Sequence, residues 1–184
     1  MTQLALGALG GIVLPPDWKD GRGSWCTPDP YATAVGRFRV DPFSNARSII
    51  KSTHACWLER GDDGFGLDRR HVHGCYYTRG VYRCADTRTK VWFQPPYDIV
   101  LDALDHFEHT RFVGLLRLDT STEWFDRMHA LCEVIMVPRN DRINFIPPPG
   151  VIASANPFPH GIYYRHADDV TDAVKALCYE WKVS

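Results

Sequence analysis

Short apolar runs alternate with helix-like segments along most of this chain, and this alternation constrains the fold more than any other feature. Strands are expected at residues 38–40, 55–58, 90–93, 111–118, 134–137 and 161–164. Helices are expected at 98–107, at 168–177, and from Thr120 to Leu131, where Thr120 and Glu123 have capping-box spacing. Strands that alternate with helices predict an α/β fold, with a mainly parallel sheet covered by helices on both faces.

The length of 184 residues predicts one domain spanning 1–184, and 45% hydrophobic residues indicate that it has a real core. Glycines and prolines make residues 1–25 a lead-in segment. Residues 69–89 are polar and predict an inserted hairpin with its turn near Gly80. Because the net charge is only −1, any nucleic-acid surface must be a local patch. Its candidates are Arg69, Arg70, Arg79, Arg83 and Arg88.

The opening apolar run, residues 4–14, predicts neither a signal peptide nor a membrane anchor. It lacks a basic region and a cleavage site, and Pro15-Pro16 ends it before it could span a bilayer. The six cysteines are scattered rather than dense, which favours reduced thiols in a cytoplasmic protein. We therefore expect no membrane partner.

Polar residues follow several of the expected strands. Asp41, Glu59, Gln94 and Asp119 each come after one of these runs. In open α/β sheets, ligands bind in the crevice at the carboxyl ends of the strands. We therefore expect a ligand site at this edge.

The sequence Gln94-Pro95-Pro96-Tyr97 directly follows one such strand. Each proline fixes φ and removes a backbone donor, so the carbonyls are held without competing N–H groups. The side-chain oxygen of Gln94 and the backbone oxygen of Pro95 could accept the hydrogens of an exocyclic amine, and Tyr97 could stack on a flipped-out base. Pro-Pro-Tyr alone also occurs in linkers and peptide ligands.

At these residues the chain resembles the adenine-N6 methyltransferases, whose motif is Asp or Asn, then Pro-Pro, then Tyr or Phe. Flanking segments extend the resemblance to the phage-type DNA adenine methyltransferase family, from near the start to about Arg165. They are residues 6–11, 25–28, 36–45, 63–65, 119–125 and 156–159. The resemblance implies a Rossmann-like class I methyltransferase fold, S-adenosylmethionine (AdoMet) as cofactor, and DNA as partner.

Carried over to this chain, the resemblance makes Gln94, Pro95, Pro96 and Tyr97 the catalytic residues. It places Thr27 and Pro28 against the methionine end of AdoMet, and Asp41, Pro42 and Phe43 at the floor of its pocket. Asp41 could instead be an acid that ends a strand. Glu59 follows the second strand at the spacing of a ribose-binding acid, and Asp63 is its rival for a cofactor contact.

For DNA, the candidates are Arg79, Tyr82 and Arg83 in the hairpin, with Ser121 and Trp124 near the site. The hairpin could equally be an insertion without function, residues 120–122 a helix cap, and Trp124 a core residue. No metal is expected. The alternative is zinc at His71, His73, Cys75 and Cys84, although no paired Cys-x-x-Cys motif supports it.

One departure from the family pattern concerns the chemistry directly. Gln94 replaces Asp or Asn and sets the carbonyl one methylene further out. A displacement of about 1 Å costs on the order of 10²-fold in rate. The sequence therefore predicts a site-specific DNA adenine-N6 methyltransferase, acting in a bacterial cell if phage-encoded. The alternative is an AdoMet- or DNA-binding protein on the same scaffold, without turnover or with an altered target, that acts against host restriction.

Overall fold

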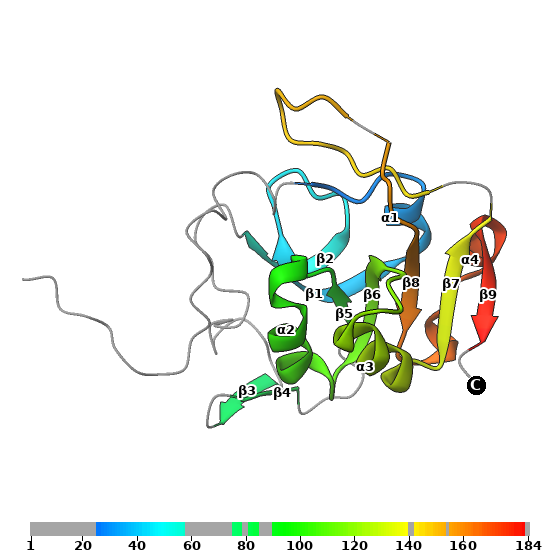
Figure 1. The fold of residues 1–184 in the computed structure, drawn as a ribbon. Helices are drawn as coiled ribbons and strands as arrows, with labels where there is room; N and C mark the ends of the chain where they lie inside the picture. The colour runs from blue at the N-terminus through cyan, green and yellow to red at the C-terminus, as the bar shows by residue number, and fades with distance from the viewer. Residues whose placement is uncertain are drawn as a thin grey trace, which may run out of the picture.

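A computed structural model of the chain describes residues 25–57, 75–78, 81–84, 90–139, 142–153 and 155–182. Within them, seven strands form one sheet in the order β2-β1-β5-β6-β8-β7-β9 (Figure 1). These strands are β1 (Arg37–Ser44), β2 (Lys51–Trp57), β5 (Lys90–Phe93), β6 (Arg111–Arg117), β7 (Val134–Pro138), β8 (His160–Tyr164) and β9 (Cys178–Lys182).

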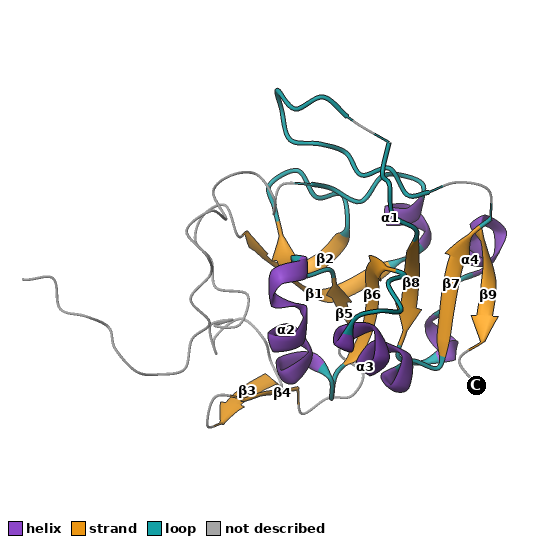
Figure 2. Cartoon of the chain, viewed as in Figure 1, coloured by secondary structure: helices purple, strands orange, loops and turns teal. Residues whose placement is uncertain are grey.

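The sheet is mixed rather than mainly parallel, which corrects the prediction. The pairs β1–β2, β1–β5 and β5–β6 are parallel, whereas β6–β8, β7–β8 and β7–β9 are antiparallel. The reason lies in the connection between β7 and β8, whose described residues form a loop beyond one end of the strands (Figure 2). Without a crossover helix, β8 must run back antiparallel to β7.

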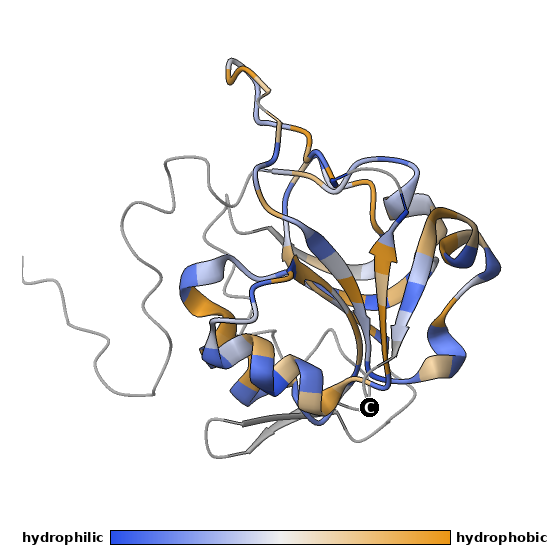
Figure 3. Ribbon diagram, turned by 45° about the vertical axis from the view of Figure 1, so that its right-hand side comes forward, coloured by the Kyte–Doolittle hydropathy of each residue, from blue (hydrophilic) through white to orange (hydrophobic). Residues whose placement is uncertain are grey.

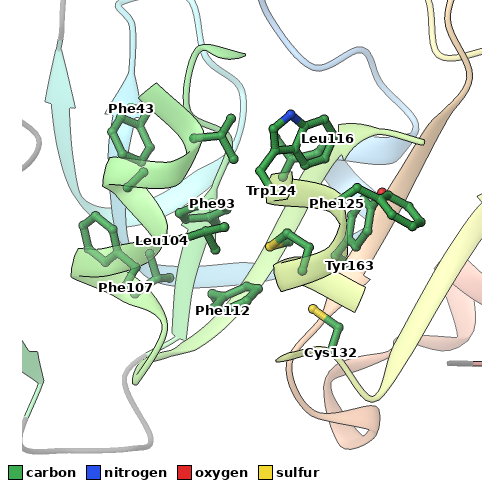
Figure 4. Packing of buried hydrophobic residues seen from close by; sticks show 14 of the residues in the cluster. Phe43, Phe93, Leu104, Phe107, Phe112, Leu116, Trp124, Phe125, Cys132 and Tyr163 are labelled. Atoms are coloured by element: carbon green, nitrogen blue, oxygen red, sulfur yellow. The ribbon is translucent and has the colours of Figure 1, made fainter. Parts of the chain in front are cut away.

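Helices cover both faces of the sheet, as predicted. On one face, α2 (Val100–Phe107) and α3 (Glu123–Leu131) pack against the strands through buried side chains such as Leu104 and Met128. Figure 4 shows part of this layer, and in Figure 3 both helices carry hydrophobic and hydrophilic positions in alternation. On the other face lie α1 (Tyr31–Ala34) and α4 (Asp172–Leu177).

The start of α3 differs from the expected capping box. The N-cap is Thr122, whose side chain accepts a hydrogen bond from the backbone N–H of Phe125. Asp119 instead accepts a 2.6 Å hydrogen bond from the Ser121 hydroxyl. The helix therefore begins two residues later than its Thr120 prediction, because Asp119 and Ser121 form a turn of their own before it.

A second, two-stranded sheet pairs β3 (Cys75–Thr78) with β4 (Val81–Cys84), within the segment predicted as an inserted hairpin. In Figure 1 it lies beside the C-terminal end of α2.

The sheet order creates a switch point between β1 and β5. The chain passes from β1 outward to β2, and β5 then pairs with the opposite side of β1. Connections that leave in opposite directions open a crevice at the carboxyl ends of two adjacent strands, which is where open α/β sheets bind ligands.

Candidate active site

A cavity of about 520 Å³ lies at this switch point. Its walls come from the ends of β1 and β5, from the end of β6, and from the start of the antiparallel strand β8. Residues 25–27 and the loop before β8 complete it. The volume falls within the range of about 300 to 1,000 Å³ that is usual for small-molecule sites. The structure thus brings the sequence before α1 and the sequence after β5 into one pocket.

Gln94 lines this cavity, and its amide oxygen is held by two donors. The Thr27 hydroxyl donates to Oε1 at 2.7 Å, and the indole Nε1 of Trp92 donates to the same atom at 3.1 Å. Trp92 and Gln94 meet because side chains two residues apart project from the same face of an extended chain. Both lone pairs of the Gln94 carbonyl are therefore used within the protein.

These bonds bear on the predicted role of the Gln94 oxygen as an acceptor for the target amine, which stays a prediction. An acceptor whose two lone pairs already have partners is not available to the amine of a target base. Gln94 still belongs to the pocket, but its carbonyl faces Thr27 and Trp92. The sequence could not predict this because Thr27 is 67 residues away.

The two prolines after Gln94 carry the chain into a short 3₁₀ turn, η4 (Tyr97–Ile99), and both line the cavity. Pro95 is buried, and the carbonyl of Pro96 accepts a 3.1 Å hydrogen bond from Ile99 N–H. Pro95 and Pro96 both lack a backbone N–H, so the chain next to the Pro95 carbonyl offers a ligand acceptors but no donor.

Tyr97 is 40% exposed, so a ligand in the cavity can reach its ring. Its hydroxyl lies 2.9 Å from Nε2 of His160, and burial raises the pKa of that hydroxyl above its usual range. The Arg117 guanidinium lies 5.0 Å from the ring centre, and the Trp124 ring lies 6.2 Å away at 36°. The orientation of Tyr97 is thus fixed from several directions.

His160 is buried at the start of β8, and burial lowers its pKa to about 4. Its Nδ1 lies 3.0 Å from the carbonyl oxygen of Phe158, which can only accept, so we assign the proton to Nδ1. The Tyr97 hydroxyl then donates to Nε2. Asn156 Nδ2 lies 3.1 Å from Nδ1 as well, and it donates one of its hydrogens to the carbonyl of Ile143. His160 is therefore a neutral positioning residue for Tyr97.

Arg117, at the end of β6, brings a cation to the cavity wall. Its guanidinium lies 3.6 Å from the centre of the Phe158 ring and pairs with Asp119 at 3.3 Å. Cation–π contacts of this kind are strongest where water is excluded. Arg117, His160 and Phe158 were not among the predicted site residues, although Phe158 lies in the segment 156–159 that contributes to the family resemblance. Only the position of Arg117 at the carboxyl end of an expected strand could have indicated any of them.

Asp41 lies inside β1 rather than after it, is 1% exposed and contributes to the cavity. Burial raises its pKa to about 7, although hydrogen bonds from the Ser44 side chain and the Phe43 N–H act in the opposite direction. Phe43 also lines the cavity, and its ring packs edge to face against Phe93 with the ring centres 6.1 Å apart. Pro28 and Pro42 are not among the lining residues.

Ser121 and Trp124 are not among the residues that line the cavity. Ser121 is exposed and bonded to Asp119, while Trp124 is 9% exposed and packs in the core next to Tyr97. Tyr82 and Arg83 lie on β4, beside α2. Glu59, Asp63, His71, His73 and Arg79 lie outside the described residues, as do Arg69, Arg70 and Arg88. Cys75 and Cys84 are cross-strand partners in the β3–β4 pair.

The described part of the chain contains neither a membrane-spanning helix nor a metal-binding group of side chains. No helix there is long and apolar enough to cross a membrane. No group of three or more His, Cys, Asp or Glu side chains there could hold a metal ion.

Comparison with protein-family models finds no match, and neither does comparison with curated proteins or with solved structures. The class defined by the fold is an α/β protein with a mixed sheet and a ligand-sized cavity at its switch point.

Proposed function

We propose that this chain is an AdoMet-dependent methyltransferase that modifies the exocyclic amine of adenine in DNA. The observation that supports it most is the shared cavity. The pocket at the switch point is lined both by Asp41, in the second half of β1, and by Gln94-Pro95-Pro96-Tyr97, after β5. Cofactor residues and target-base residues must meet in one pocket for direct transfer, because the reacting atoms need to approach within about 3.5 Å.

The residues around the cavity suit AdoMet chemically. Bound AdoMet supplies an electrophilic methyl group on a sulfonium. Thr27 and Asp41 offer a hydroxyl and a carboxyl group, and Phe43 offers an apolar surface beside them. A parallel half-sheet with helices on both faces is also the scaffold of Rossmann-like nucleotide sites.

The residues after β5 suit a flipped base. The Pro95 carbonyl can accept one hydrogen of the amine. This hydrogen bond would orient the nitrogen lone pair for attack on the methyl group. The exposed ring of Tyr97, fixed by His160 and Arg117, offers a stacking surface. A surface that is already fixed loses little conformational entropy when the base arrives.

The experiment is transfer of labelled methyl from AdoMet to unmethylated DNA by the purified protein. We expect incorporation by wild type and a loss of about 100-fold in Tyr97→Ala, because the base is then no longer held in a reactive position. Tyr179→Ala is the matched control, since Tyr179 is an exposed aromatic on β9 outside the cavity. Equal activity in both variants would contradict the assignment of Tyr97.

A second candidate is a protein that binds AdoMet or DNA on this scaffold without transfer to adenine, acting in the cytoplasm of a bacterial host. The observation that favours it is the engaged Gln94 oxygen, which removes the side-chain acceptor of the family motif. Calorimetry separates the two proposals. AdoMet binding without incorporation of label into any DNA would favour the second candidate.

A further inference from the structure

The hydrogen bonds of Gln94 determine which end of its amide faces the cavity. An indole N–H can only donate, so the Gln94 atom 3.1 Å from Trp92 Nε1 must be the oxygen. The reverse orientation would place two donors against each other. Thr27 donates to the same oxygen at 2.7 Å. The hydrogen-bond partners therefore distinguish Oε1 of Gln94 from Nε2.

The amide nitrogen is left for the ligand. Gln94 lines the cavity, and Nε2 has no hydrogen-bond partner among the residues that the structure describes. At this position the pocket thus presents a donor, where the carboxylate of an Asp-Pro-Pro-Tyr motif would present only acceptors. Gln94 is only partly buried, so solvent can reach this donor while the cavity is empty. Once a bound base excludes that water, the donor requires an acceptor on the ligand, because leaving it unpaired costs more than the bond itself contributes.

Resting on the proposed function, we propose that Gln94 is a specificity-determining donor that bonds the ring nitrogen beside the target amine. The Pro95 carbonyl takes the amine hydrogen, and Gln94 Nε2–H meets the adjacent unprotonated ring nitrogen. Trp92 is the positioning residue, since its indole holds the amide in this orientation. The target is therefore a base edge on which an amino group stands next to a ring acceptor.

On the Watson–Crick edge, two DNA bases carry this pair of groups, adenine with N6 and N1, and cytosine with N4 and N3. Guanine and thymine present a ring N–H at the corresponding place, which would meet the Gln94 donor directly. A site of this kind rejects such an edge because both donors would lose water without gaining a partner. The sequence resemblance favours adenine of the two, and the experiment below includes both.

The test replaces only the ring acceptor. The base that wild type methylates is mapped first, and an oligonucleotide then carries 1-deazaadenine there, or 3-deazacytosine if cytosine is the target. We expect kcat/KM to fall about 10- to 100-fold, the usual effect of removing one partner of a buried hydrogen bond. Affinity for the same oligonucleotide, measured by fluorescence anisotropy with S-adenosylhomocysteine present, should fall in parallel.

The control variant is Gln94→Glu, assayed at a pH where the carboxylate is ionised. It keeps acceptors for Thr27 and Trp92 but has no donor for the ring nitrogen. In this variant the ratio between natural and deaza substrate should fall to about 1. Comparing the two ratios cancels any effect of the deaza base on duplex stability, because that effect is common to both proteins.

Trp92→Phe provides a second variant. It removes the indole donor and lets the Gln94 amide rotate, so the discrimination ratio should also decrease. If wild type methylates the natural and the deaza substrate with equal kcat/KM, this inference alone is overturned. Absence of methylation on every base would overturn the proposed function and the inference together.

Discussion

The Thr27 hydroxyl donates a 2.7 Å hydrogen bond to Oε1 of Gln94, across 67 residues of sequence. Thr27 is 3% exposed and precedes α1, whereas Gln94 follows β5. The bond therefore ties the segment before the first helix to the loop that carries the proposed target-base residues. It also occupies one lone pair of the Gln94 amide, so it sets the chemistry that this side chain presents to the cavity.

Replacing Thr27 by Val should lower the free energy of unfolding by about 0.5 to 1.5 kcal/mol, because one buried hydrogen bond is lost while the shape is kept. Urea denaturation measures the change. Thr27→Ser keeps the hydroxyl and should cost less. A Ser variant as unstable as the Val variant would show that packing of the methyl group, rather than the bond, holds this contact.

Asp41→Asn should change how stability depends on pH. Burial raises the pKa of Asp41 from 3.8 to about 7 in the folded state, so the folded protein holds a proton that the unfolded chain releases. The wild type therefore loses stability as pH rises from about 4 to about 7, by at most about 1.4 kcal/mol per pH unit. The advantage of Asp41→Asn over wild type should grow through this window and then level off.

Asp119→Asn is the control for that experiment. The Ser121 hydroxyl and N–H lower the pKa of Asp119. Asp119 is therefore ionised in both the folded and the unfolded chain above about pH 5. Its difference from wild type should stay constant between about pH 5 and about pH 8. A parallel rise in both variants would show that Asp41 is not the group responsible.

His160→Gln should reveal a dependence of the opposite sign. Burial lowers the pKa of His160 from 6.5 to about 4, so the unfolded chain binds a proton that the folded protein excludes. The wild type loses this stability as pH falls from about 6.5 to about 4, and Gln, which does not titrate, removes the loss. Denaturant titrations of both proteins across that range measure it. A difference independent of pH would mean that folding leaves the pKa of His160 unchanged, which would contradict the burial of this imidazole.

Gly161→Ala should destabilise the sheet by about 1 to 3 kcal/mol through overpacking. A Cβ at Gly161 would lie 2.9 Å from Cδ2 of Leu118 and 3.0 Å from Cγ2 of Ile135, closer than side-chain carbons pack. Thermal unfolding followed by circular dichroism measures the loss. Addition of Leu118→Ala should restore part of it, and a double variant less stable than the sum of both would contradict this explanation.

The sequence could predict the elements that depend on local pattern. Strand β5 was predicted in full, since three apolar residues, Val91–Phe93, follow Lys90 and two prolines come after Gln94. The meeting of Asp41 and Gln94 at one pocket also followed from the convergence of parallel strands at their carboxyl ends. Trp92, two residues before Gln94 on the same face, could have been recognised from the period of an extended chain.

The rest depends on tertiary structure. His160 reaches the cavity because β8 runs antiparallel and begins at the edge where β5 and β6 end, and no local pattern gives the direction of a strand. For the same reason the sheet was predicted as mainly parallel. The orientation of the Gln94 amide depends on Thr27 and Trp92 together, and the sequence alone does not show that these two side chains meet at Gln94.

The most direct test identifies the atom that receives the methyl group. Unmethylated DNA is incubated with the protein and AdoMet that carries a deuterated methyl group, then digested to nucleosides for mass spectrometry. Our account predicts label on N6 of deoxyadenosine, with none on guanine or thymine. Absence of label from every nucleoside while AdoMet binds to the protein, or label on guanine or thymine, would contradict it.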